Sequence, residues 1–222
     1  MSIRHLAVIG ALITGVVFAG SSADAACVVP PFTATYEVEA LGLDTGSSHD
    51  DVRRDGANFA IETTADAHVL FYRRNEVEKT SGRVVGGNLE PRVYSWGTPS
   101  GSKGTAKVPE GALDTLTLGV QLRADLARNK IPTKLRVADK TSSVHDAEVS
   151  TLPGTKKVKT KIGDFDTRVV ALEGLPLIRE FWFEEKGDHR LVRIVVHDSA
   201  VGEVNITLSA YDEKTGPCVI AE

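Results

Sequence analysis

The feature that most constrains this chain is the alternation of apolar and polar side chains in short runs. In Phe32–Ala40 every second residue is apolar, with threonine or glutamate between. A period of two places the apolar side chains on one face of a half-buried antiparallel strand. Similar runs continue to residues 204–210, and turn signals such as Asp55-Gly56 separate them. We predict eleven or twelve short strands, and in residues 156–162 we expect Val158 and Ile162 to face inward.

One segment, residues 112–128, has helical periodicity instead. Leu118, Leu122 and Leu126 recur at four-residue spacing and form an apolar stripe. Asp114 can cap the free amides of the first turn. We predict a single helix that links two β-rich halves and covers one sheet face. The predicted fold class is mostly β, an antiparallel meander curled into an open barrel or β-spiral.

The first 25 residues resemble an export signal. Arg4 and His5 precede an apolar run over residues 6–20, and Ala23-Asp24-Ala25 offers the small residues that a signal peptidase reads. The run is short for a bilayer span, so we favour cleavage over the alternative of a lone anchor. Residues 26–222 would then form a single β-rich domain in the periplasm, with no stable transmembrane segment.

Two cysteines, Cys27 and Cys218, follow the leader and lie near opposite ends of the remaining chain. In an oxidising compartment an even pair favours a disulfide, and the alternative is two free thiols. Such a bond would close a loop of roughly 190 residues and add at most about 5 kcal/mol of stability. A redox role would favour cysteines close in sequence, so we interpret the pair as structural.

Residues that could carry chemistry are not arranged in a known catalytic motif. Three histidines, His49, His145 and His197, are each followed by aspartate, but adjacent strand residues point to opposite faces and cannot easily hold one ion. The chain has no HExxH, no G-x-S-x-G and no Cys/His cluster. A formal net charge of −4 argues against a nucleic-acid partner. We expect no catalytic residues, no metal and no cofactor.

Aromatic residues on otherwise polar strand faces suggest a different kind of site. Phe181 and Phe183 share one strand face, which leaves Trp182 on the other between two glutamates. Residues 191–196 are apolar on both faces in places, so either both faces are packed or one holds an apolar ligand. The candidate lining residues are Trp182, Trp96, Phe71, Tyr72, Leu122 and Leu126.

The order of several motifs resembles a known bacterial family. These motifs are Tyr36-Glu37-Val38, Phe71-Tyr72-Arg73, Asn88-Leu89-Glu90-Pro91, the helix over 114–126, residues 163–167, and Phe181-Trp182-Phe183 leading to Leu191-Val192-Arg193. Together they resemble the exported family known as domain of unknown function 3108, over nearly all of the chain after the leader. Leu191 departs from the pattern, which would place proline there.

The resemblance implies a periplasmic β-spiral or half-barrel, similar in outline to lipoprotein carriers and to envelope-integrity proteins of alphaproteobacteria. The latter join their chain ends by a disulfide, which Cys27 and Cys218 could reproduce. The family supplies no catalytic residues. We therefore predict a non-enzymatic envelope protein that binds a lipid, a lipidated protein or an envelope polymer. The alternatives are an interaction scaffold that docks an envelope protein and, third, a hydrolase.

Overall fold

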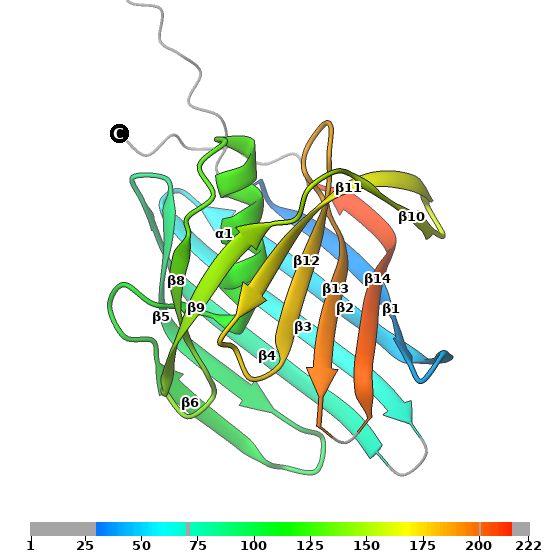
Figure 1. The fold of residues 1–222 in the computed structure, drawn as a ribbon. Coiled ribbons are helices and arrows are strands. Elements are labelled where there is room, and N and C mark those ends of the chain that lie inside the picture. The colour runs from blue at the N-terminus through cyan, green and yellow to red at the C-terminus, as the bar shows by residue number, and fades with distance from the viewer. Residues whose placement is uncertain (1–29, 70–71, 200, 215–222) are drawn as a thin grey trace, which may run out of the picture.

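The structure, a computed structural model, describes residues 30–69, 72–199 and 201–214. These residues form fourteen strands and one helix (Figure 1). In chain order the elements are β1 (Phe32–Ala40), β2 (Leu43–Asp55), β3 (Asn58–Val69), β4 (Tyr72–Val85), β5 (Asn88–Gly97), β6 (Lys103–Lys107), β7 (Leu113–Asp114), α1 (Thr115–Ala127), β8 (Lys134–Ala138), β9 (Val144–Thr151), β10 (Lys156–Thr160), β11 (Gly163–Glu173), β12 (Ile178–Glu184), β13 (Leu191–Asp198) and β14 (Gly202–Glu213).

All the strands belong to one sheet, in which the first and last strands are neighbours. The order is β6-β5-β4-β3-β2-β1-β14-β13-β12-β11-β9-β8-β7, and β10 pairs with β11 outside this path. Neighbours are antiparallel, except that β7 and β8 are parallel. Hydrogen bonds do not join the two ends of this order, so the sheet curls without closing (Figure 1). The predicted fold class is confirmed.

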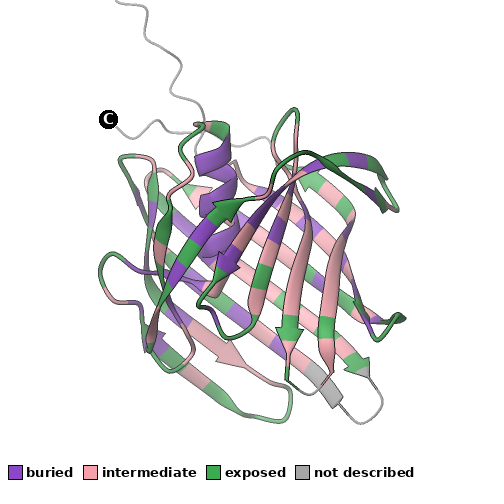
Figure 2. Cartoon of the chain, viewed as in Figure 1, coloured by how far each residue is buried: buried purple, intermediate pink, exposed green. Residues whose placement is uncertain are grey.

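Helix α1 lies inside the curled sheet, where Figure 2 shows it almost entirely buried. Leu118 and Leu122 are fully covered and pack in the main core with Phe181 and Phe183 of β12. Four polar residues of the helix are buried as well, namely Thr117, Gln121, Arg123 and Asp125. The leucine stripe of the helix is buried against the inner face of the sheet, as predicted. The sheet curls far enough around the helix to bury most of its other side chains as well.

The helix begins and ends close to the predicted positions. Asp114 is its N-cap and accepts hydrogen bonds from the amides of Leu116 and Thr117, while its own amide donates to the Thr117 hydroxyl. This reciprocal arrangement satisfies donors that a first turn leaves free. Ala112 precedes the helix, and Arg128 is the C-cap. The predicted cap is confirmed, and the helix itself is shorter than residues 112–128.

The hairpin of β10 and β11 packs on the outer face of the sheet. Val158 and Phe165 join Val192 and Trp182 there in a small cluster. Val158 is buried as predicted, but Ile162 lies in the turn beyond the end of β10 and is exposed. The expectation that Ile162 faces inward is wrong, because the alternation of β10 stops at Thr160.

Several predictions concern residues outside the described part of the chain. They are the leader, both cysteines of the predicted disulfide and Phe71. Among the described residues, no helix combines the length and the apolar character needed to cross a bilayer.

Candidate functional site

A cavity of about 100 Å³ lies between helix α1 and the inner face of the curled sheet. The apolar side chains that line it come from the helix and from strands on both sides of the β1–β14 junction. They are Phe32, Leu116, Val120, Phe181, Leu191 and Ile194. An apolar pocket with a few placed polar groups is the usual form of a small-ligand site.

Gly119 of the helix also lines the cavity. A Cβ atom at this position would stand 3.1 Å from Phe181 Cε1 and 3.3 Å from Leu191 Cδ2. A larger side chain at position 119 would therefore crowd Phe181 and Leu191, and Leu116 and Val120 line the cavity beside it.

Arg123 forms the cationic end of the cavity. The residue is only 6% exposed. Its Nε donates to the Asp188 carbonyl at 2.9 Å, and its Nη1 donates to the Tyr211 hydroxyl at 3.0 Å. The guanidinium carbon also lies 5.2 Å from the centre of the Phe32 ring. Among the described residues no carboxylate forms an ion pair with Arg123, so its buried charge is held by dipoles and ring faces alone.

A second arginine, Arg190, shares the Tyr211 ring with Arg123. Arg190 lies 5.5 Å from the centre of the Tyr211 ring, and Arg123 lies 5.8 Å from it. Arg190 is neutralised by Glu184, which accepts from its Nε at 2.8 Å and from its Nη2 at 2.9 Å. Burial raises the pKa of Tyr211, so its hydroxyl stays neutral. Among Arg123, Arg190, Glu184 and Tyr211, one positive charge therefore has no negative partner, and it is the charge of Arg123.

Asp50 of β2 lies at another part of the same cavity. Its Oδ1 accepts a hydrogen bond from the Thr63 hydroxyl at 2.8 Å. Burial raises the pKa of Asp50 to about 6, against smaller lowering effects from Thr63 and His49. The charge of Asp50, after burial itself, raises the pKa of the neighbouring Tyr36 hydroxyl. The cavity thus has a cationic end and a weakly acidic end, joined by apolar walls.

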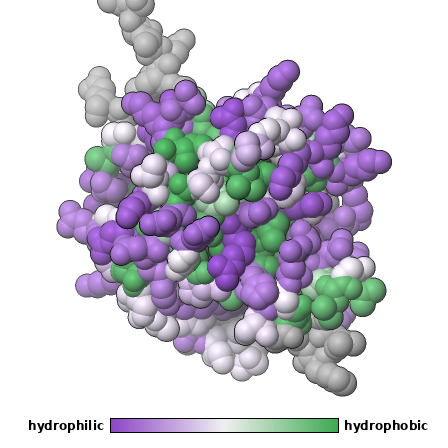
Figure 3. Space-filling view, viewed as in Figure 1, coloured by the Kyte–Doolittle hydropathy of each residue, from purple (hydrophilic) through white to green (hydrophobic). Residues whose placement is uncertain are grey.

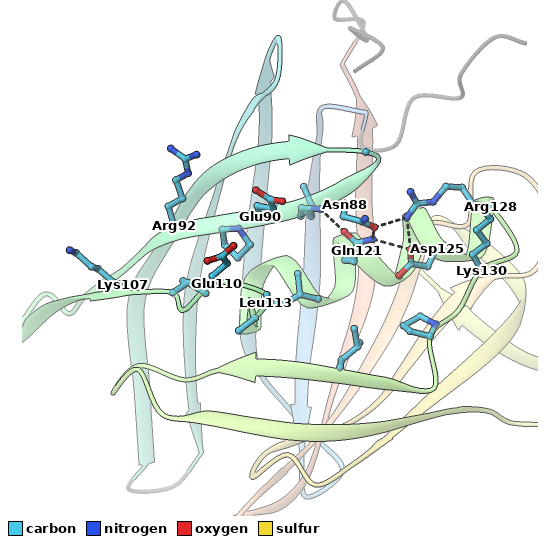
Figure 4. Close-up of a pocket in the computed structure, with 18 residues that line it drawn as sticks. Asn88, Glu90, Arg92, Lys107, Glu110, Leu113, Gln121, Asp125, Arg128 and Lys130 are labelled. Atoms are coloured by element: carbon cyan, nitrogen blue, oxygen red, sulfur yellow. Dashed lines mark hydrogen bonds and ion pairs between the residues drawn. The ribbon is translucent and has the colours of Figure 1, made fainter. Parts of the chain in front are cut away.

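A larger cleft, of about 890 Å³, opens where the sheet fails to close (Figure 4). Strand β6 pairs with β5 only from Val93 onward, so the first part of β5 has an open edge. There Gln121 of the helix accepts from the Leu89 amide at 2.7 Å and donates to Asp125 at 2.9 Å. Arg128 pairs with Asp125. The rest of the lining carries both charges, from Glu90, Arg92, Lys107, Glu110 and Lys130.

Comparisons with known proteins do not assign the chain. No family model matches it, and no curated protein was found to match. Among the described residues there is also no group of three or more histidine, cysteine or acidic side chains that could hold a metal ion.

The residues predicted to line a site lie apart from one another. Leu122 and Leu126 are core residues, and Tyr72 begins β4. Trp96 packs against Tyr94, with ring centres 6.1 Å apart. Leu122, Leu126 and Trp96 are not among the residues that line the cavity or the cleft.

Trp182 lies on the outer face of the sheet. Lys156 and Arg193 approach its ring at 4.7 and 5.4 Å, and its indole N–H donates to Glu180. Arg123, Asp50 and Tyr211 were not predicted as site residues. The one available signal was Arg123, a cation next to Leu122 on the apolar side of a short helix.

Proposed function

We propose that this protein is a non-enzymatic periplasmic envelope protein that binds an anionic amphiphile, an acyl chain with an acidic head group, inside the curled sheet. The observation that carries the proposal is Arg123, a buried guanidinium with no carboxylate partner in the described structure, at the end of an apolar cavity. A buried charge is costly unless it is paired. A carboxylate or phosphate on the ligand would supply the missing charge and could bind the guanidinium fork through two hydrogen bonds.

The inner wall offers a continuation for the chain of such a ligand. Ile194 lines the cavity and pairs across strands with Phe181 on one side and Ile206 on the other. Ile206 in turn pairs with Val38 of β1. Directly paired residues share a sheet face, so these side chains form one apolar path along the interior. The cavity itself would hold the head group and the first carbons, with the rest of the chain along this path.

The charges in the cavity set the orientation of the ligand. Arg123 attracts an anionic head group, whereas ionised Asp50 repels it. The head group is therefore placed at Tyr211 and Arg123, away from Asp50. The periplasmic location rests on the leader and on the family resemblance of the sequence.

The proposal is tested by measuring the binding of oleate and of oleyl alcohol, which has the same chain without the charge, by calorimetry. We expect Arg123→Met to weaken oleate binding by about tenfold or more, because the charge-assisted pair is lost, and to leave alcohol binding nearly unchanged. Arg123→Lys should retain part of the preference for oleate. The matched control is Arg193→Met, which removes a cation from the outer face.

Two results would contradict the proposal in different ways. If the wild-type protein binds neither compound, the interior is not a ligand site. If it binds both equally, and Arg123→Met changes nothing, the ligand is apolar and Arg123 serves the fold alone.

The open cleft favours a second function, that of a scaffold for another envelope protein. An exposed strand edge with alternating charges can pair with an extended peptide. A photo-crosslinker at Arg92, which lines the cleft, should then capture one defined protein in cells. If the crosslinker captures no partner and lipid co-purifies with the protein, the scaffold function is rejected and amphiphile binding remains the only proposed function.

A further inference from the structure

Two hairpin tips on one side of the molecule carry exposed apolar residues. Leu41 in the β1–β2 turn is 59% exposed, and Leu43, the first residue of β2, is 58% exposed. In the β10–β11 turn Ile162 is 42% exposed. Figure 1 shows both tips at the right of the molecule. In the space-filling view a hydrophobic lobe stands out at the lower right, where Figure 1 places the β1–β2 turn (Figure 3).

An ion pair joins the β10–β11 tip to strand β1. Lys161, next to Ile162, pairs with Glu37 of β1. Its ammonium also lies close enough to Asp44, which follows Leu43, for that carboxylate to help raise the lysine pKa after the larger effect of Glu37. The β10–β11 hairpin is thus held beside the strand that leads into the β1–β2 turn.

The backbone of the β1–β2 turn does not favour leucine. Leu41 has φ +55° and Gly42 has φ +74°. A two-residue hairpin turn with both values positive normally takes Asn-Gly or Asp-Gly, and a bulky residue at positive φ is uncommon. A Cβ atom placed on Gly42 would meet nothing within 4 Å, so the tip stands clear of the rest of the protein. Neither turn geometry nor packing explains a leucine here, and such an outlier points to a function.

We propose that these two tips insert into a lipid bilayer surface and dock the protein on it. A protein partner is less suited to them, because a stable interface takes about 20–30 residues from each side and the tips offer three apolar side chains. Protruding apolar residues suit the boundary between head groups and acyl chains, and at the β10–β11 tip lysines precede Ile162. The hairpin over residues 156–167 carries four lysines against two aspartates. Since Glu37, Glu39 and Asp44 lie nearby, apolar insertion contributes more than charge.

Docking does not depend on the ligand proposed for the cavity, because it uses the outside of the molecule. The two proposals can therefore fail separately. A protein that binds no amphiphile would still attach to vesicles through the tips, and one that binds oleate could still fail to attach.

The test is co-sedimentation of the purified protein with vesicles of phosphatidylethanolamine and phosphatidylglycerol, and with vesicles of phosphatidylcholine. Leu41→Asn should lower the bound fraction by about fivefold or more, because it removes an inserting side chain. The same change should leave the melting temperature unchanged or raise it, because asparagine suits positive φ. Loss of binding therefore cannot be confused with loss of folding. Ile162→Asn should act in the same direction.

The matched control is Val85→Asn. Val85 is also exposed, but it precedes the β4–β5 turn, at the opposite end of the strands from the β1–β2 turn. Binding by this variant should equal that of the wild type. The proposal is overturned if the wild-type protein stays in the supernatant with both kinds of vesicle, or if Leu41→Asn and Val85→Asn bind equally well.

Discussion

Asp50 and Asp51 are neighbours in β2, yet they occupy opposite electrostatic environments. Asp50 faces the interior and lines the cavity. Asp51 faces outward, where its carboxylate accepts hydrogen bonds from Arg53 and Lys214 at 2.8 and 2.9 Å. Partial burial acts to raise the pKa of Asp51, but these two cations outweigh it and lower the value. Burial raises the pKa of Asp50 to about 6. The pKa values of the two carboxyl groups shift in opposite directions because adjacent residues of a strand point to opposite faces of the sheet.

Asp50→Asn should stabilise the protein at neutral pH. In the unfolded chain Asp50 ionises near 3.8, so the stability that comes from its protonated form is present below about pH 4 and lost as the pH rises through 6. Asparagine avoids that loss and keeps an oxygen for Thr63. We expect the free energy of unfolding to rise by about 1–2 kcal/mol at pH 7 and to change little at pH 4. Urea denaturation at the two pH values measures this.

Asp51→Asn is the control, with the opposite sign. The lowered pKa of Asp51 means that its ionised form stabilises the folded state above about pH 4. This variant should therefore lose a little stability at pH 7. If both variants shift stability in the same direction, the assignment of Asp50 to the interior is wrong.

At the level of elements, the cap of α1 joins the helix to a distant strand. Asp114 Oδ1 accepts from the first helical amides, while Oδ2 accepts from the Thr80 hydroxyl of β4 at 2.5 Å. Burial raises the pKa of Asp114, against lowering by these hydrogen bonds. One carboxyl group therefore fixes both the start of the helix and its position inside the sheet.

Asp114→Ala should lower the free energy of unfolding by about 2 kcal/mol, because it removes the cap and leaves buried donors without a partner. Asp114→Asn keeps an acceptor for the amides of the first turn, so its free energy of unfolding should fall clearly less than that of Asp114→Ala. Chemical denaturation monitored by circular dichroism compares the two. Equal losses would mean that the negative charge, not the cap, holds the helix in place.

The strands and the helix could be predicted because their signals are local. The alternation in β1, the turn at Asp55-Gly56 and the cap at Asp114 each depend on residues a few positions apart. The site could not be predicted in this way. Arg123 meets Tyr211 across 88 positions and Gln121 meets Leu89 across 32, and these contacts exist only because the sheet curls around the helix. The hydrophobic stripe indicated one buried helix face and gave no signal that the others are buried too.

For the whole molecule, the register of β1 and β14 bears on the predicted disulfide. Phe32, at the start of β1, pairs with Glu213, at the end of β14. Cys27 precedes the first of these by five residues, and Cys218 follows the second by five. The described ends of β1 and β14 therefore lie side by side, and the disulfide between Cys27 and Cys218, which lie outside the described residues, stays a prediction.

Cys218→Ser should lower the melting temperature in oxidising buffer and have no effect under reductant. The free energy of unfolding should fall by at most about 5 kcal/mol, because a cross-link that closes so long a loop lowers the entropy of the unfolded chain. Differential scanning calorimetry in both buffers measures it, with Cys27→Ser expected to match. Identical melting temperatures for variant and wild type in oxidising buffer would show that no stabilising bond forms.

The pairing of β1 with β14 also sets the order in which the molecule can assemble. Strand β1 is made first, yet the neighbour on one of its two sides is the last strand of the sheet. During synthesis β1 therefore has no partner on this side until β14 has been made, and an unpaired strand edge recruits other strands. Folding can therefore be completed only when β14 pairs with β1. A chain truncated before β14 would keep this edge of β1 unpaired and would be prone to aggregate.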